Sequence, residues 1–156
     1  MKKVNFLELT AAFVLGAAFT TGLVIVDKNL EKSEEEHSHL SEWELTQMGI
    51  IMTESNFRTD AVGKTNDHGI FQITPVYVKE CNRIVGKNTY SLRDAYNPIK
   101  AKEMFDIYQG AKNRDCDYDL AIYLHNPNGG ERYYNLVSKN IEFCRRYEHI
   151  REIVKK

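Results

Sequence analysis

One acidic residue of the 156-residue chain, Glu54, has the surroundings that a general acid needs. It follows the apolar run Ile50–Met52 near the C-terminal end of a predicted helix. The negative end of a helix dipole and apolar neighbours both disfavour an ionised carboxylate. A carboxyl group that keeps its proton near neutral pH can protonate a leaving group. The position alone is more typical of a surface glutamate at a helix end, so the interpretation depends on the residues that follow.

Several short motifs follow Glu54 in order: Glu54-Ser55-Asn56-Phe57, Ala61-Val62-Gly63, Gly69-Ile70-Phe71-Gln72-Ile73, Leu92–Ala101, and Leu124-His125-Asn126 before Gly129-Gly130. This order resembles the lysozyme-like lytic transglycosylase family (the SLT domain), which is related to goose-type lysozyme. In that family a Glu-Ser pair ends a helix and a Gly-Leu-Met-Gln-Ile motif follows. Here Ile70 and Phe71 replace Leu and Met, which keeps both positions apolar. The resemblance covers about residues 41–140 and implies a mostly α, lysozyme-like helical domain.

The family's last motif, Ala-Tyr-Asn near a Gly-rich turn, has two candidates in this chain. Ala95-Tyr96-Asn97 matches in every letter, but it lies where the family has an Asp-x-x-Asn element. Leu124-His125-Asn126 follows an apolar helical segment and precedes Gly129-Gly130, as the family's motif does. We therefore take the second as the match, with His125 in place of the tyrosine. His125 can still donate a hydrogen bond, and Tyr123 could supply the phenol instead.

The resemblance also implies a substrate and a role for each matching residue. The substrate is the peptidoglycan glycan strand, cut between N-acetylmuramic acid and N-acetylglucosamine. Glu54 would protonate the bridging oxygen and then act as a base, so that the muramic 6-hydroxyl closes a 1,6-anhydro ring without water. Ser55 would orient Glu54, Gln72 and Asn126 would bind the saccharide, and Phe71 would pack against it. No metal and no organic cofactor is implied.

Three alternatives remain open at this stage. Most glycosidases use a second carboxylate, and Asp67 in the loop after Glu54 is the candidate, which would make the enzyme a hydrolytic muramidase (lysozyme). The replacement of tyrosine by His125 favours a non-catalytic cell-wall-binding or assembly protein that kept the fold. A membrane-anchored helical adaptor would explain the helices but would leave the order of the motifs to coincidence.

Capping and breaking residues predict the helices that position these motifs. Ser41 and Glu44 form a capping box for a helix over 41–55, and Pro75 after Thr74 starts a helix over 75–85. Asn97-Pro98 repeats that signal for a helix through residue 111, and Asp117 or Asp119 starts a fourth helix that ends before Pro127. A last helix is predicted over 131–150 and a loop over 58–69. No segment alternates strictly, so the fold class is mostly α.

Helical spacing also predicts which side chains face the core. In the first helix these are Leu40, Trp43, Met48 and Ile51. In the third they are Ile99, Met104 or Phe105, and Tyr108. In the last they are Tyr134, Val137, Ile141 and Tyr147.

The N-terminal segment, residues 1–30, differs from the rest of the chain. Residues 10–26 carry no charge, and a transmembrane helix is predicted over about 5–26. Lys2 and Lys3 precede the run, which favours export of the remainder. No small-x-small cleavage site follows, so we favour an uncleaved anchor over a cleaved signal peptide, and both over a buried helix. A charged stalk over 31–40 would join it to a lysozyme-like domain over 41–156.

Composition fits a globular, exported protein. The chain has 21 basic and 22 acidic residues, a net charge of −1, so nothing in the bulk charge suggests a nucleic-acid partner. Three cysteines allow at most one disulfide, and none has the spacing of a zinc site. Export and the resemblance together predict an extracytoplasmic enzyme anchored to the inner or cytoplasmic membrane, or secreted if the signal is cleaved. By family analogy it could serve an envelope-spanning secretion or conjugation machine.

Overall fold

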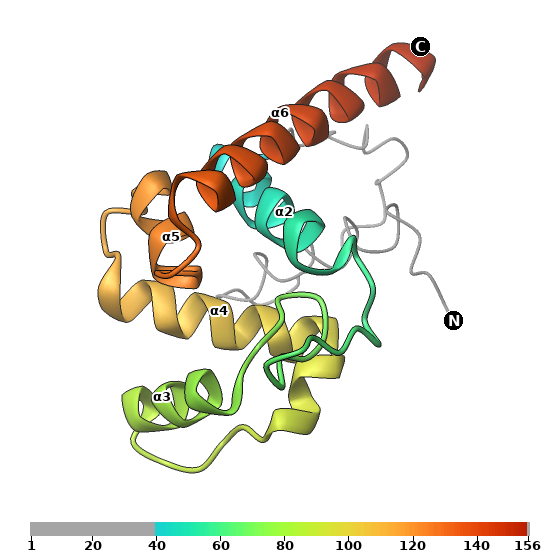
Figure 1. Ribbon diagram of the computed structural model, residues 1–156. Helices are drawn as coiled ribbons and strands as arrows, with labels where there is room; N and C mark the ends of the chain where they lie inside the picture. Colours follow the sequence, from blue (N-terminus) through green and yellow to red (C-terminus); the bar gives the residue numbers. More distant parts are fainter. Residues whose placement is uncertain (1–39, 156) are drawn as a thin grey trace, which may run out of the picture.

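A computed structural model describes residues 40–155 of the chain, with side chains through residue 149. Its helices, in chain order, are α2 (Glu42–Ser55), α3 (Pro75–Val85), the 3₁₀ helix η1 (Leu92–Tyr96), α4 (Pro98–Lys112), α5 (Tyr118–His125) and α6 (Gly130–Lys155) (Figure 1). No strand forms between residues 40 and 155, where only isolated bridges join Val62 to His68 and His68 to Ile73. The mostly α fold class predicted from the sequence is therefore confirmed.

The predicted membrane segment, about residues 5–26, and residues 31–39 of the predicted stalk lie outside the described residues. Among the helices from residue 40 onward, none combines the length and the apolar character needed to cross a bilayer.

Local capping chemistry starts the helices where the sequence predicts. The Ser41 hydroxyl oxygen accepts from the Glu44 N–H at 3.2 Å, and the Glu44 carboxylate accepts from the Ser41 N–H at 2.8 Å, which completes the capping box. Asn97 caps α4 by accepting from two backbone N–H groups, and Asp117 caps α5 by accepting from the Leu120 N–H. The last helix is longer than predicted, and η1 was not predicted at all.

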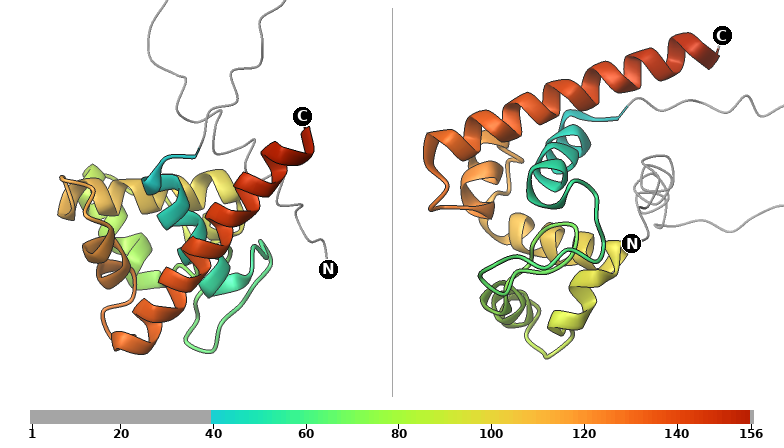
Figure 2. Two further views of the ribbon diagram at one scale, coloured as in Figure 1. Left: turned by 90° about the horizontal axis from the view of Figure 1, so that it is seen from above. Right: turned by 45° about the vertical axis from the view of Figure 1, so that its right-hand side comes forward.

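Helices α2 and α6 pack closely against each other, while α4 crosses beneath α2 (Figures 1 and 2). Gly49 permits the close approach, because a Cβ there would overlap the Ile141 side chain and lie 3.1 Å from the Val137 carbonyl oxygen. Farther along the same contact, the Asn140 side-chain amide donates to the Thr53 hydroxyl at 2.9 Å. The C-terminal half of α6 extends beyond the body of the domain (Figure 1). The contact between α2 and α6 therefore sets where the C-terminal end of α2 lies.

The core lies between α2, α4 and the segment Ile70–Ile73, and two details of the predicted core are wrong. Ile99 is 60% exposed, because the inward stripe of α4 is Ala101, Met104 and Phe105, and Ile99 lies on the opposite side. In α6 the buried positions are Val137 and Cys144, with Ile141 packed against them, whereas Tyr134 and Tyr147 are partly exposed. The inward stripe of α6 therefore passes through Tyr133 rather than Tyr134.

All three cysteines are free thiols. Cys81 and Cys144 are buried, and Cys116 is exposed. Burial raises the pKa of Cys81 to about 12, with a smaller contribution from the charge of Glu80. Burial also raises the pKa of Cys144 to about 11. Both thiols therefore behave as small apolar core residues.

Candidate functional site

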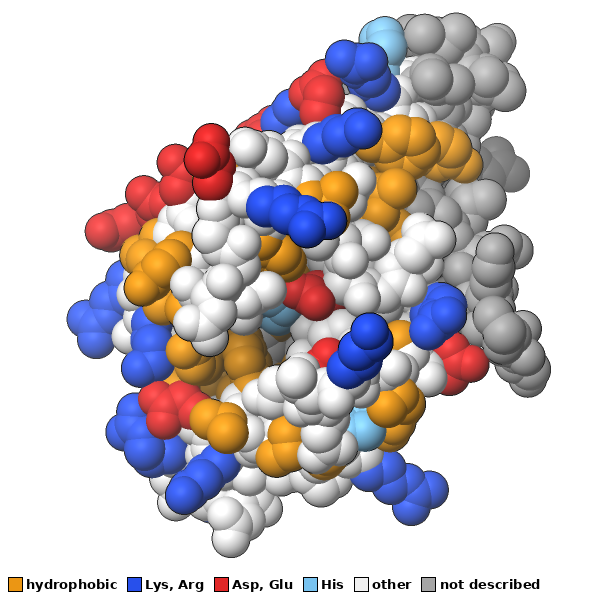
Figure 3. All heavy atoms as spheres, viewed as in Figure 1, with side chains coloured by type: hydrophobic (Ala, Val, Ile, Leu, Met, Phe, Trp, Pro, Cys, Tyr) orange, Lys and Arg blue, Asp and Glu red, His pale blue; other side chains and the backbone are white. Residues whose placement is uncertain are grey.

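The face seen in Figure 3 is hollowed, and acidic and histidine side chains are visible in the hollow. Glu54 lies one residue before the end of α2, and its side chain is 17% exposed. Asn56 and Phe57, directly after the Glu-Ser pair, both adopt left-handed backbone conformations (φ 51° and 61°). Such conformations cost about 1–3 kcal/mol each in non-glycine residues and tend to cluster at functional sites. The chain thus turns sharply away from α2 just after Glu54.

Tyr133 of α6 holds the Glu54 carboxyl group. Its phenol O–H donates to Glu54 Oε1 at 2.5 Å. Burial, followed by the charge of Glu54 and this hydrogen bond, raises the pKa of Tyr133 well above its ordinary value. The phenol therefore remains protonated and acts only as a hydrogen-bond donor to Glu54. Sequence reasoning missed Tyr133, because it placed the neighbouring Tyr134 on the inward face of α6.

Gly129 explains how Tyr133 reaches this position. A Cβ on Gly129 would lie 2.5 Å from the Tyr133 Cβ and 3.1 Å from the Asn126 Cγ. Gly130 has a left-handed conformation (φ 59°), which suits a residue without a side chain. The Gly129-Gly130 turn therefore brings the first turn of α6 close to Asn126, with Tyr133 facing Glu54.

His125 lies behind the carboxyl group, in an aromatic environment. Its side chain is 5% exposed, and its ring centroid lies 5.8–6.1 Å from those of Phe71, Tyr77 and Phe105. Nε2 donates to the Phe71 carbonyl oxygen at 3.0 Å and lies 3.6 Å from Glu54 Oε1. Nδ1 has no hydrogen-bond partner in the described part of the chain. Because a carbonyl oxygen only accepts, the proton of the neutral imidazole belongs on Nε2.

Burial lowers the pKa of His125, although the charge of Glu54 and the hydrogen bond to Phe71 oppose the shift. The unfolded chain should therefore take up a proton near pH 6.5 while the folded chain does not. We expect the free energy of unfolding to fall as the pH drops below about 6.5, until the folded pKa is reached. Denaturant titrations at several pH values would measure this slope. It should be smaller in His125→Gln than in the wild-type protein. Equal slopes in the two proteins would contradict the prediction.

Ser55 does not orient Glu54 in the way the resemblance implied. Its hydroxyl lies 2.9 Å from the Ile70 carbonyl oxygen and 3.2 Å from that of Ile51. The side chain is buried and makes no hydrogen bond to the Glu54 carboxyl group. Ser55 instead ties the end of α2 to the segment that carries Gln72, so it positions Glu54 through the backbone.

Phe71 also differs from its expected role of packing against the saccharide. The side chain is fully buried, and its ring stacks on Phe105 with centroids 4.8 Å apart. An alternating pattern of buried and exposed residues does not explain the burial of Phe71, since Ile70 and Ile73 in the same short segment are buried as well. Phe71 therefore supports the site from the core, and its carbonyl oxygen holds His125.

Gln72 and Asp67 lie together over Gly63. A Cβ on Gly63 would collide with the Asp67 carboxylate and lie 2.6 Å from Gln72 Oε1. Gln72 has a left-handed backbone (φ 49°), and its side-chain amide donates to the Gly69 carbonyl oxygen at 2.9 Å. Asp67 accepts a short hydrogen bond from the Thr65 hydroxyl. No hydrogen bond joins Asp67 or Gln72 to Glu54 within residues 40–155.

The two candidates for the last motif have different places in the structure. Asn97 caps α4, and the Tyr96 hydroxyl is paired with His68 Nδ1 at 2.5 Å. The polar side chains of Ala95-Tyr96-Asn97 therefore make hydrogen bonds that stabilise the fold. Asn126 and Tyr123 instead line a pocket beside Tyr133. Tyr123 is 60% exposed and makes no hydrogen bond to Glu54. The phenol that contacts Glu54 is that of Tyr133, and a contact of Tyr123 with the saccharide stays a prediction.

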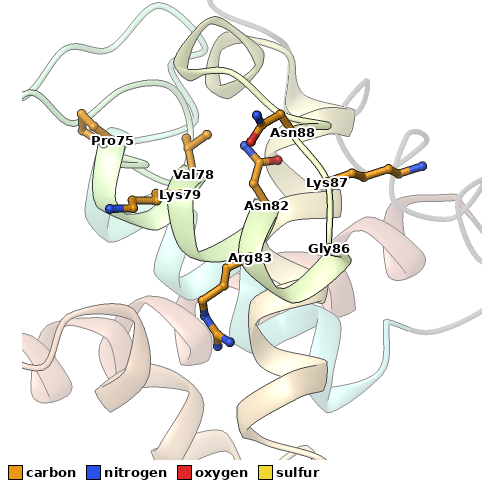
Figure 4. A pocket seen from close by; sticks show the side chains of 8 residues that line it. All are labelled: Pro75, Val78, Lys79, Asn82, Arg83, Gly86, Lys87 and Asn88. Atoms are coloured by element: carbon orange, nitrogen blue, oxygen red, sulfur yellow. The ribbon is translucent and has the colours of Figure 1, made fainter.

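A surface depression of about 670 Å³ lies along α3 and contains none of these residues. Figure 4 shows its lining, including Lys79, Arg83 and Lys87. Arg83 is paired with Glu80 at 2.7 Å, and Asn82 holds the backbone of Tyr90. No three His, Cys, Asp or Glu side chains lie close enough to hold a metal ion in the described part of the chain.

A family model, the transglycosylase SLT domain, matches residues 29–113, which is more than half of the chain. The chain belongs to this family. The match contains Glu54, Ser55 and Gln72 and ends before α5, so His125, Asn126 and Tyr133 lie beyond it. No curated protein and no solved structure matches the chain. Membership in the SLT family implies a glycan-cleaving enzyme that acts on peptidoglycan.

Tyr133→Phe tests the contact between α6 and Glu54 in this SLT-domain protein. Removing the phenol oxygen deletes one hydrogen bond to the carboxyl group and leaves the ring in place. We expect kcat/KM for peptidoglycan cleavage to fall about tenfold to a hundredfold. Tyr90→Phe is a matched control, because it removes another tyrosine–glutamate hydrogen bond, to Glu103, away from Glu54. Equal rates in the two variants would argue against a role for Tyr133.

Proposed function

We propose that the protein cleaves peptidoglycan glycan strands between N-acetylmuramic acid and N-acetylglucosamine, with Glu54 as its single acid and base. The observation that carries the proposal is the setting of Glu54. Its side chain is 17% exposed at the end of α2, and the partly buried phenol of Tyr133 donates to one of its two carboxyl oxygens at 2.5 Å. A carboxyl group held in one orientation and partly shielded from water suits general acid catalysis.

In this proposal the two carboxyl oxygens of Glu54 have different tasks. Oε1 accepts from Tyr133 and is the oxygen nearest His125 Nε2. A proton for the leaving group therefore belongs on Oε2. As the bond from C1 to the bridging oxygen breaks, that oxygen takes the Oε2 proton and C1 gains oxocarbenium character. The ionised Glu54 then accepts the proton of the muramic 6-hydroxyl as that oxygen bonds to C1, which gives a 1,6-anhydro product.

The remaining residues divide into two groups. Gln72, Asn126 and Tyr123 are half-buried or exposed and are proposed to contact the saccharide. Ser55, Phe71, His125 and Tyr133 position Glu54 from the core, through the hydrogen bonds described above. Asp67 accepts a hydrogen bond within its own loop, as is common for turn residues, which favours a mechanism with one carboxylate.

The product ends distinguish the possible reactions. Purified peptidoglycan is digested with the full-length protein, and the glycan ends are analysed by mass spectrometry. Anhydromuramic ends would support the proposal, and reducing muramic ends would replace it with a hydrolase, for which Asp67→Asn is the next variant. Absence of cleavage would favour the non-catalytic wall-binding protein.

We also propose that the N-terminal segment holds this enzyme on the outer side of the cytoplasmic membrane. The uncharged run over residues 10–26, preceded by Lys2 and Lys3, supports the proposal. An anchor there would keep a nearly neutral enzyme close to the wall, where an envelope-spanning machine could use it. N-terminal sequencing of the protein made in cells is the test, and a mature start near Asp27 would overturn the anchor.

A further inference from the structure

One face of α6 carries a row of exposed apolar side chains, which we call the α6 stripe. Its members are Leu136, Phe143 and Tyr147, which are 47%, 53% and 39% exposed. They are seven and four residues apart, so they share one face of the helix. This face is turned about 90° from Val137 and Cys144, which are buried in the core. Helix α6 therefore has a second apolar face beside the one that packs on α2.

Basic side chains run beside the α6 stripe. Arg132, Lys139 and Arg146 are seven residues apart, and all three are exposed. Each lies three or four positions from a residue of the stripe, which is the spacing of neighbours on a helix surface. Arg146 is paired with Glu142 at 3.2 Å but keeps 76% of its side chain exposed, and Arg132 and Lys139 make no ion pair within residues 40–149. An apolar row edged with positive charge fits a surface that is anionic outside and apolar beneath.

The chain enters the domain beside the same helix. The Leu40 N–H donates to Glu148 Oε1 at 2.6 Å, next to the half of α6 that extends beyond the body of the domain (Figure 2). Only residues 27–39 separate Leu40 from the proposed membrane anchor, and a segment of that length spans at most about 45 Å. The anchor would therefore keep the extending half of α6 within reach of the bilayer.

A second copy of the chain fits the α6 stripe less well than a lipid surface does. Antiparallel packing of two such stripes across a twofold axis places the same side of each helix opposite its counterpart. The two rows of Arg132, Lys139 and Arg146 would then face each other, and like charges at that spacing repel. The charge pattern therefore favours an anionic surface over self-association.

We propose that the extending half of α6 lies on an anionic lipid bilayer, with Phe143 and Tyr147 in the interface and Lys139 and Arg146 at the lipid phosphates. Long basic side chains can reach headgroup phosphates while apolar neighbours enter the boundary of the acyl chains. The assignment rests on the proposed membrane anchor, since the anchor brings this helix to the bilayer.

This contact leaves the catalytic end of α6 clear of the lipid. Tyr133, whose phenol donates to Glu54, precedes Phe143 by ten residues, which is about 15 Å along the helix axis. The anchor and the helix together give the domain two attachments to the membrane. Two attachments restrict rotation of the domain, so they hold Glu54 in one orientation above the bilayer.

Fluorescence quenching by brominated lipid tests the contact in the full-length protein. Phe143→Trp and Arg145→Trp are each reconstituted in nanodiscs of brominated phosphatidylcholine, with or without phosphatidylglycerol, and the signal of the native Trp43 is subtracted using the wild type. Phe143→Trp should be quenched strongly in the anionic discs and less in the neutral ones. Arg145→Trp is the matched control, because two residues turn the position by about 200° around the helix, and it should be quenched in neither.

The charge of the basic row should control the contact. The extent of quenching gives the ratio of lipid-bound to free α6 in the anionic discs. Adding Lys139→Gln to Phe143→Trp should lower this ratio about fivefold, since one basic residue near an anionic surface contributes about that factor. Lys87→Gln removes an exposed lysine beside α3 instead and should leave the ratio unchanged.

Equal quenching of Phe143→Trp and Arg145→Trp, or quenching of Phe143→Trp that Lys139→Gln leaves unchanged, would overturn the assignment. So would blue-shifted emission of Phe143→Trp without quenching, because protein would then cover the stripe. Failure of the proposed anchor is a separate result: the protein made in cells starts near Asp27, and on anionic vesicles the quenching that depends on Lys139 is still present.

Discussion

Glu54→Gln should lower the rate of peptidoglycan cleavage by about 10²–10⁴-fold, the range that general acid–base groups typically contribute. Glutamine fills the same space and its carbonyl oxygen can still accept from the Tyr133 phenol, so the fold should persist. It carries no proton that can pass to the bridging oxygen, and it cannot act as a base afterwards. Release of soluble muropeptides, measured at matched enzyme concentration, gives the rate.

Glu103→Gln is the matched control for this substitution. Glu103 also accepts from a tyrosine hydroxyl, that of Tyr90 at 3.2 Å, but it lies on α4 and outside the candidate site. The two variants should have similar thermal midpoints, and only Glu54→Gln should lose activity. Full activity of Glu54→Gln would exclude Glu54 as the acid and with it the proposed mechanism.

Phe71→Ala should lower the free energy of unfolding by about 3–5 kcal/mol, the usual cost of removing a buried phenylalanine ring. The ring is fully buried and stacks on Phe105, so its removal leaves a cavity at the centre of the core. A ring that instead contacted the saccharide would change KM and leave stability nearly unchanged. Denaturant titration of the variant therefore distinguishes a core role from a substrate-binding role.

Phe143→Ala provides the comparison for a phenylalanine outside the core. Its side chain is 53% exposed on α6, so we expect a loss below about 1 kcal/mol. Equal losses for the two variants would contradict the burial of Phe71. Since the Phe71 carbonyl oxygen also holds His125, the substitution should reduce activity even under conditions where the variant is folded.

The helices were predictable because their start signals act locally. A capping box needs only Ser41 and Glu44, and the start of α4 needs only Asn97 and Pro98, so neither depends on distant parts of the chain. The order of the motifs likewise identified Glu54 and Gln72, and with them the family. Those features depend on residues that are close together in the sequence, so the sequence alone is enough to predict them.

The phase of α6 was not predictable in the same way. Tyr133 and Tyr134 are adjacent and identical in type, and a shift of one residue turns a helix face by about 100°. Only the close contact at Gly49 and the Gly129-Gly130 turn decide that Tyr133 points to Glu54. The replacement of the family tyrosine by His125 could be read from the sequence, but the residue that supplies the phenol could not.

By itself the sequence determined the family, the helical order and the residue that should carry the acid chemistry. Tertiary structure decided that Phe71 and His125 face the core, that Ser55 acts through the backbone, and that Tyr133 completes the environment of Glu54. The difference comes from how far apart in the sequence the interacting residues lie. Caps, turns and motif order depend on interactions within a few residues, whereas Tyr133 and Glu54 are 79 positions apart and meet only because α2 and α6 pack together.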